Sequence, residues 1–274
     1  MDTEQQVAKH YSHGALESAI LEALKASGKN IDKLATSDLA GVDEFHLGWR
    51  AATVEIAKDL GLSSTMHVLD VGSGIGGPAR YFAEAHGAQV TGIDLTDEFV
   101  QVANALTRRC GLADRARFQQ ASALALPFKD DTFDAATMIH VGMNIEDKAK
   151  VFSEVARVLR PKAHFAVYDV MRTAKGDIPY PMPWAATTST SFVRTPDDYR
   201  QMLAGAGFKI EGEVSRRDLA LKLWEEMRRK IAEHGPPKLS LHVLMGEAAK
   251  PRLANVISTL ERGIIAPIEI IGRT

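Results

Sequence analysis

The strongest constraint on the fold is an alternation of short apolar runs and amphipathic stretches between residues 67 and 170. The apolar runs predict strands at His67–Val71, Gln89–Leu95, Arg117–Ala121, Phe133–Val141 and His164–Val170. Helical periodicity fills the gaps, over residues 78–86, 97–110 and 145–159. Because the connecting loops are short, the strands must run parallel with right-handed crossovers. We therefore expect an α/β fold with a doubly wound, Rossmann-like sheet.

Residues on either side of this alternation predict an extension and two insertions. Residues 1–62 read as an N-terminal helical lid, with helices over 15–25 and 47–60, and residues 63–274 as the main domain. Thr195 followed by Pro196 and two acids predicts the start of a helix. The remaining predictions are insertions at about 171–195 and 218–262, a strand over 209–214, helices over 218–233 and 241–261, and a final strand over Ile264–Ile271.

Composition excludes several classes of partner. The chain has 33 Lys and Arg against 35 Asp and Glu, so it lacks the basic footprint of a nucleic-acid-binding protein. No apolar run approaches the roughly 20 residues of a membrane span, and the polar N-terminus does not resemble a signal peptide, so we expect a cytoplasmic protein. Cys110 is the single cysteine, and the spacing of His10, His13 and His46 fits no ligand set, so no metal site is expected.

A glycine-rich loop follows the first predicted strand. The segment Gly72-Ser73-Gly74-Ile75-Gly76 precedes a helix that Pro78 opens. Glycines at such a turn let a ligand approach the backbone closely. Together with Gly77, the segment also satisfies the dinucleotide pattern G-x-G-x-x-G, which alone is a weak signal.

Two acids at strand ends narrow the choice of ligand. Asp70 lies two residues before the first glycine, where a carboxylate repels a pyrophosphate but attracts the sulfonium and ammonium of S-adenosylmethionine. Asp94 ends the second strand and fits a pair of hydrogen bonds from ribose hydroxyls, which both cofactor classes use. The alternatives are that Asp70 caps a turn and that Asp94 caps the helix beginning near Asp97.

Four motifs in order give residues 66–170 a resemblance to a known family. They are 68–80, with the glycine loop, 90–96, then 123–128 with 131–134, and 154–161. The segment resembles class I S-adenosylmethionine-dependent methyltransferases. The N-terminal helices and residues 42–48 are similar to the branch that contains sarcosine/dimethylglycine, tocopherol and quinone methyltransferases. The resemblance implies a seven-stranded sheet with its last strand antiparallel, N-terminal helices and a helical cap.

The resemblance also implies a cofactor site. Gly72, Ser73, Gly74 and Gly76 would line the methionine portion of S-adenosylmethionine. Asp94 and Leu95 would hold the ribose and flank the adenine, Ser122 and Ala123 would meet the adenine edge, and His140 would lie near the sulfonium. The family usually has an acid at the position of Ser122, so this chain's contact with the adenine amine is expected to be weaker or water-mediated.

Methyl transfer from a sulfonium needs few catalytic groups. The protein holds acceptor, methyl and sulfur in line, and a base is needed only if the acceptor loses a proton. His140 is the candidate for a base or positioning group. Asn144 also fits a helix N-cap, and Trp184 also fits a loop anchor. The candidate acceptor contacts are Tyr11 as part of the lid, Trp49, Met143, Asn144 and Trp184.

The expected function is methyl transfer to the N, C or O atom of a small molecule. An apolar or amphipathic acceptor predicts an apolar pocket built by the two insertions. An amine of the dimethylglycine type predicts cationic groups there, for which Arg172 and Arg194 are available. The alternatives are an NAD(P)-dependent oxidoreductase and a catalytically inactive cofactor-binding module.

Overall fold

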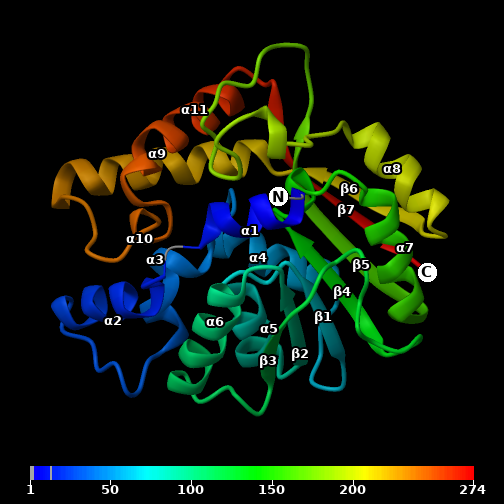
Figure 1. Ribbon diagram of the computed structural model, residues 1–274, viewed down its shortest axis with the longest axis horizontal. Coiled ribbons are helices and arrows are strands. Elements are labelled where there is room, and N and C mark those ends of the chain that lie inside the picture. The colour runs from blue at the N-terminus through cyan, green and yellow to red at the C-terminus, as the bar shows by residue number, and fades with distance from the viewer. Residues whose placement is uncertain (1–2, 13) are drawn as a thin grey trace.

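The computed structural model describes residues 3–12 and 14–274, and they form a single mixed sheet flanked by helices (Figure 1). The strands lie in the order β3-β2-β1-β4-β5-β7-β6. Their bounds are β1 His67–Val71, β2 Gln89–Asp94, β3 Ala116–Gln120, β4 Phe133–Ile139, β5 Leu159–Arg172, β6 Lys209–Ser215 and β7 Ile265–Arg273.

Pairing within the sheet confirms the predicted topology. Strands β1 to β5 pair in parallel, whereas β7 runs antiparallel to both β5 and β6. The expectation of a seven-stranded sheet with its last strand antiparallel is confirmed. Strand β5 is longer than predicted because Leu159 already pairs with Phe133 and Arg172 still pairs with Ile265.

Helices cover both faces of the sheet, as a doubly wound fold requires. On one face α7 (Lys148–Val158) and α8 (Pro196–Gly205) bury Phe152, Val155 and Tyr199 against Leu69 and Phe165. The other face carries α4 (Trp49–Asp59), α5 (Gly77–His86) and α6 (Asp97–Arg109). The alternating inward and outward side chains of β1 thus serve two separate cores.

The N-terminal elements pack onto α6 and cross the carboxyl ends of the strands. They are α1 (Thr3–Tyr11), α2 (Leu16–Ala26), a 3-10 turn η1 (Thr36–Leu39) and α3 (Ala40–Asp43). Leu16, Ile20 and Leu24 form the buried face of α2, as the periodicity predicts. Figure 1 shows α1 lying across the end of the sheet toward which β1 and β4 point.

The C-terminal cap differs from its prediction. It consists of α9 (Arg217–His234), α10 (His242–Met245), the turn η4 (Gly246–Ala248) and α11 (Ala249–Glu261), which gather above α2 and α3 in Figure 1. The single helix predicted over 241–261 is wrong, because Gly246 has φ 59° and ψ −150°, which no helix accommodates. No helix of the described chain is long and apolar enough to cross a membrane.

A buried ion pair joins α3 to the sheet domain. Arg80 and Asp43 have fully buried side chains and a 2.5 Å contact between Nη2 and Oδ1. The same guanidinium donates to the hydroxyl of Thr107, at 3.0 Å. The backbone of Asp43 also lies so close to Gly77 that a Cβ there would come within 1.9 Å of its carbonyl oxygen. The segment that precedes α4 is therefore fixed against the helix that follows the glycine loop.

Candidate functional site

A cavity of about 580 Å³ lies at the carboxyl ends of the parallel strands, where ligands bind in open α/β sheets. The glycine loop and the ends of β1, β2 and β4 form its floor, and α1, residues 42–49 and the helical cap close over it. The predicted site residues that line it are Tyr11, Trp49, Asp70, Gly72, Ser73, Gly74, Asp94, Leu95, Ala123, His140, Met143, Asn144 and Trp184. Gly76 and Ser122 are not among the lining residues.

The glycine loop is shaped by left-handed backbone at alternate positions. Gly74 has φ 53°, and a Cβ there would meet no atom within 4 Å, so this position faces open space. Gly76 has φ 87°, and a Cβ there would come within 2.6 Å of the Phe118 ring. Gly74 therefore leaves room for a ligand, whereas Gly76 is required for packing beneath the loop.

Asp70 lines the cavity and has one carboxylate oxygen without a partner among the described residues. Its Oδ1 accepts a hydrogen bond from the Thr137 hydroxyl at 2.8 Å, while Oδ2 is buried with no partner among the described residues. Burial is the main cause that raises the pKa of Asp70 to about 7, with a further part of this shift from the nearby Asp94 and Glu44, while the hydrogen bond from Thr137 opposes it. A buried carboxylate with a free oxygen is a site for a cation.

Asp94 is held toward the glycine loop by backbone donors. Gly74 N–H donates to Oδ2 and Thr96 N–H to Oδ1, each at 2.9 Å. Burial raises the pKa of Asp94, and these hydrogen bonds oppose the shift. The carboxylate oxygens are hydrogen-bond acceptors, which are the groups that a ribose diol requires.

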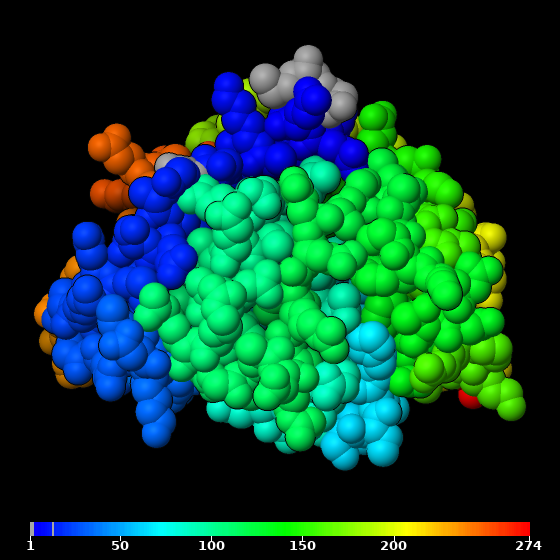
Figure 2. Space-filling model, turned by 60° about the horizontal axis from the view of Figure 1, so that its bottom comes forward, coloured from blue at the N-terminus to red at the C-terminus, as the bar shows by residue number. Residues whose placement is uncertain are grey.

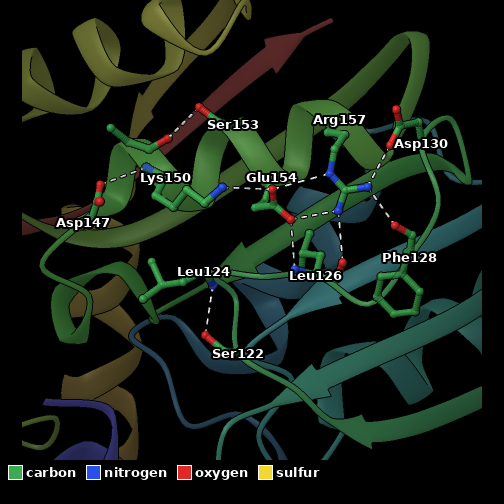
Figure 3. Close-up of polar contacts among 11 residues, drawn as sticks. Ser122, Leu124, Leu126, Phe128, Asp130, Asp147, Lys150, Ser153, Glu154 and Arg157 are labelled. Carbon is green, nitrogen blue, oxygen red and sulfur yellow. Dashed lines mark hydrogen bonds and ion pairs between the residues drawn. The ribbon is translucent and has the colours of Figure 1, made fainter. Parts of the chain in front are cut away.

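Ser122 is engaged by a residue that the sequence did not single out. Its hydroxyl donates to Glu4 Oε1 at 2.5 Å, and Glu4 itself lines the cavity. Its Oγ also accepts from Leu124 N–H at 3.1 Å, as Figure 3 shows. The expectation that Ser122 meets the adenine edge stays a prediction, but Glu4 already occupies the hydroxyl that would make the contact.

His140 is neutral and its Nε2 is occupied. Nε2 accepts a hydrogen bond from Leu47 N–H at 3.2 Å, so the ring proton must lie on Nδ1. Burial, with the neighbouring His46, lowers the pKa of His140 well below its usual value. Nδ1 is buried with no partner in the described part of the chain. His140 can therefore donate one hydrogen bond, but this arrangement is poorly suited to accepting a proton.

Asn144 links α1 to the segment that follows β5. Its Oδ1 accepts from the Tyr11 hydroxyl at 2.9 Å, and its Nδ2 donates to the Trp184 carbonyl at 2.7 Å. The predicted N-cap role is wrong, because α7 begins later and Asp147 caps it by accepting from Lys150 N–H at 2.9 Å. Three segments distant in sequence thus meet at one amide.

Comparison with known proteins shows which family the chain belongs to. A family model described as "Methyltransferase domain" matches residues 69–167. The O-methyltransferase resE of Aspergillus sclerotiorum is 31% identical over 186 residues, which cover 66% of this chain and 69% of that protein. The chain belongs to the class I S-adenosylmethionine-dependent methyltransferases. The fold of the methyltransferase also matches a solved structure, the [4+2]-cyclase SpnF, with TM-score 0.71 and 22% identity, over 100% of this chain and 97% of that one.

Other curated relatives match less than half of this chain. The sterol 24-C-methyltransferase ERG6B of Gibberella zeae is 37% identical over 118 residues, or 43% of this chain and 31% of that protein. The chain spans 39%, 31% and 48% of the length of three such relatives.

The features of the donor site fit S-adenosylmethionine, the cofactor of the family. The orphaned Oδ2 of Asp70 suits the cofactor's ammonium, and the open space at Gly74 suits its methionine portion. Asp94 has acceptor capacity for the ribose. A pyrophosphate would instead meet the carboxylate of Asp70 at this turn, which disfavours the NAD(P) alternative.

The other half of the methyltransferase cavity is apolar. Its side chains come from the helical cap, residues 171–195, the segment before α4, and residues in or just after β4 and β5. They are Leu47, Met143, Val170, Pro183, Trp184, Trp224, Leu241, Leu244, Leu253, Val256 and Ile257. Arg172 and Arg194 are not among the described lining residues, so neither offers a cation to an acceptor carboxylate inside the cavity.

Histidines near the cavity do not assemble a metal site in the described ranges. His10 Nε2 contacts the Pro183 carbonyl at 3.1 Å, and His46 Nε2 contacts Glu44 at 2.8 Å. His13 lies outside the described residues. No group of three or more potential ligands occurs within residues 3–12 and 14–274.

Proposed function

We propose that this methyltransferase transfers the methyl group of S-adenosylmethionine to an apolar or amphipathic small molecule. One observation carries the proposal: a single cavity contains both the Asp70–Gly74 floor and the apolar wall of the cap. A donor bound over the glycine loop and an acceptor held by the cap would therefore share one enclosed space. Apolar walls recognise an acceptor by burying its hydrocarbon surface.

The residues of the donor half bind and orient the cofactor. Asp70 would receive the ammonium and Asp94 the ribose hydroxyls, while the backbone at Gly74 leaves space for the chain between them. When bound, the cofactor supplies an already activated methyl group. The main task of the protein is then to align the acceptor with it and to exclude water.

The lid and the first insertion would close the acceptor half. Tyr11, Asn144 and Trp184 line the cavity and form one hydrogen-bonded chain, and Trp184 Nε1 is itself anchored on Ser191 at 2.9 Å. Trp49 and Met143 line the same space. This arrangement supports residues 1–62 as a lid, with Tyr11 as its latch on Asn144.

His140 would help to position the acceptor and would not remove a proton from it. Its Nε2 is engaged by Leu47 N–H, and its depressed pKa keeps the ring neutral. Nδ1–H is left to donate toward the cavity or to hold the end of β4. An acceptor that needs no strong base, such as an electron-rich carbon or an already ionised oxygen, suits this site best.

The test combines a binding and a transfer measurement. Isothermal titration of the protein with S-adenosylhomocysteine should show binding, and titration with NAD should not. Transfer from methyl-labelled S-adenosylmethionine should then favour a sterol, isoprenoid or phenol over dimethylglycine. Binding of NAD alone would overturn the proposal, and tight binding without transfer to any acceptor would favour a cofactor-binding module.

A further inference from the structure

A carboxylate from the N-terminal helix reaches the end of the cavity expected to hold the adenine. Glu4 and Val7 of α1 line this end together with Leu95, Ala123 and Leu124. Glu4 is 118 residues away from Ser122 in sequence, yet its Oε1 accepts the Ser122 hydroxyl at 2.5 Å. The acid at this end of the cavity therefore comes from α1 and not from the segment that follows β3.

Ser122 gives Glu4 a fixed anchor. The connection from β3 to β4 is held by α7, where Glu154 accepts from Leu126 N–H at 3.0 Å and Arg157 donates to the Phe128 carbonyl at 2.8 Å. Figure 3 shows these contacts converging on the segment that begins at Ser122. A rigid loop thus sets the position of the Glu4 carboxylate whenever α1 is closed.

The chemistry of this end matches an exocyclic amine. Leu95, Ala123 and Leu124 offer no polar side-chain atom, and the donor hydrogen of Ser122 is already given to Glu4. A carboxylate has about four lone-pair sites, of which Ser122 uses one. An amine that lies against these apolar side chains would donate a charge-assisted hydrogen bond to the Glu4 carboxylate.

We propose that Glu4 recognises the adenine amine of the cofactor and so couples cofactor binding to closure of α1. The proposal rests on the proposed function, because it assumes an adenosyl ligand. No residue of α1 is buried, so the helix is held by its edge contacts with the rest of the chain. Figure 2 shows this N-terminal segment, in blue, lying on the surface along one margin of the molecule. A ligand that adds a contact to Glu4 shifts the helix toward its closed position.

The first measurement is the affinity for two ligands that differ only at the amine. S-adenosylhomocysteine carries the amine, and the analogue in which unsubstituted purine replaces adenine carries a hydrogen atom in its place. The wild-type protein should prefer the adenosyl ligand, and Glu4→Ala should weaken its binding about tenfold while abolishing the preference. Glu22→Ala, which removes an exposed acid from α2, is the matched control and should change neither affinity.

A second variant separates recognition from closure. Ser122→Asp in the Glu4→Ala background returns an acid to the rigid loop and should restore the preference for the adenine amine. Trypsin cleavage after the exposed Lys9 reports closure of α1. S-adenosylhomocysteine should slow this cleavage in the wild-type protein but not in the double variant.

The outcomes distinguish the two proposals. If the wild-type protein binds S-adenosylhomocysteine but Glu4→Ala keeps the same preference, the role of Glu4 is overturned and the proposed function stands. The role of Glu4 also fails if the ligand slows cleavage equally in the wild-type protein and the double variant. If the wild-type protein binds neither ligand, the proposed function itself fails.

Discussion

Asp70 and Thr137 lie side by side on β1 and β4, and a 2.8 Å hydrogen bond joins their side chains. This bond fixes one carboxylate oxygen and leaves the other, Oδ2, buried without a partner in the described structure. Because the pKa of Asp70 is raised to about 7, the unliganded site is close to the pH at which it gains or loses its charge. The donor site is therefore built to be completed by a cation.

Cofactor affinity should depend on pH through Asp70. Below pH 7 the carboxyl binds a proton, which the cofactor's ammonium must displace, so affinity should fall by up to about tenfold per pH unit. Titrations with S-adenosylhomocysteine at pH 6 and 8, in buffers of different ionisation enthalpy, would measure both the affinity and the released proton. Asp70→Asn should remove the proton release and most of the binding. Unchanged affinity across this range would contradict the assignment of Asp70.

The same residue should destabilise the unliganded protein at high pH. The folded pKa of about 7 lies above the ordinary 3.8, so the folded state binds more protons between these values and stability falls as pH rises through them. Asp70→Asn cannot titrate, so the variant does not lose this stability as the pH rises. In thermal unfolding, the Tm of the variant minus the Tm of the wild-type protein should therefore increase between pH 5.5 and pH 8. A constant difference in Tm would show that Asp70 carries no such charge.

Arg80 should be essential to stability. Its side chain is fully buried with Asp43, whose pKa burial raises to about 6 despite this partner. Arg80→Met would leave the Asp43 carboxylate buried alone, which costs about 3–5 kcal/mol of unfolding free energy. Urea denaturation at pH 8 measures the loss. Adding Asp43→Asn to Arg80→Met should recover part of it, and a double variant no more stable than Arg80→Met would argue against an uncompensated charge.

His140 should matter as an acceptor of the Leu47 N–H and not as a base. His140→Gln retains an acceptor, so it should keep turnover within about threefold of the wild type, whereas His140→Ala should lose about tenfold. Single-turnover transfer from labelled S-adenosylmethionine would compare them. Equal, large losses in both variants, with an inflection near pH 6.5 present only in the wild type, would restore His140 as a base.

Local patterns predicted most of the sheet and the floor of the site. Alternating periodicity located β1 and β2, and strand-end position brought Asp70, Asp94 and His140 to one cavity, because parallel strands place their carboxyl ends together. These features depend on neighbours in sequence. The ends of β5 could not be read because its extra pairs with β4 and β7 are tertiary contacts.

The roof of the site depends on contacts across long sequence separations. Glu4 stands out as a candidate site residue only because Ser122 lies beside it in the structure. The sequence of α1 gave no pattern of buried apolar residues that would predict its packing, since none of its residues is buried. Asn144 fits an N-cap by sequence, but its amide is drawn away by Tyr11 and Trp184. The neutral residue at position 122 was the one sequence signal at this end of the site, and it predicted only a weaker or water-mediated contact with the adenine amine.

The apolar wall should control the acceptor and not the cofactor. Trp224 of α9 lines the cavity, whereas Ile231, two turns later on the same helix, is 37% exposed and is not among the lining residues. Trp224→Ala removes apolar surface worth about 1.5–3 kcal/mol, so kcat/KM for an apolar acceptor should fall at least tenfold. Ile231→Ala is the matched control and should leave kcat/KM unchanged. The dissociation constant of S-adenosylhomocysteine should stay the same in both variants. A loss of cofactor affinity in Trp224→Ala, with acceptor KM unaltered, would instead assign this wall to the donor half.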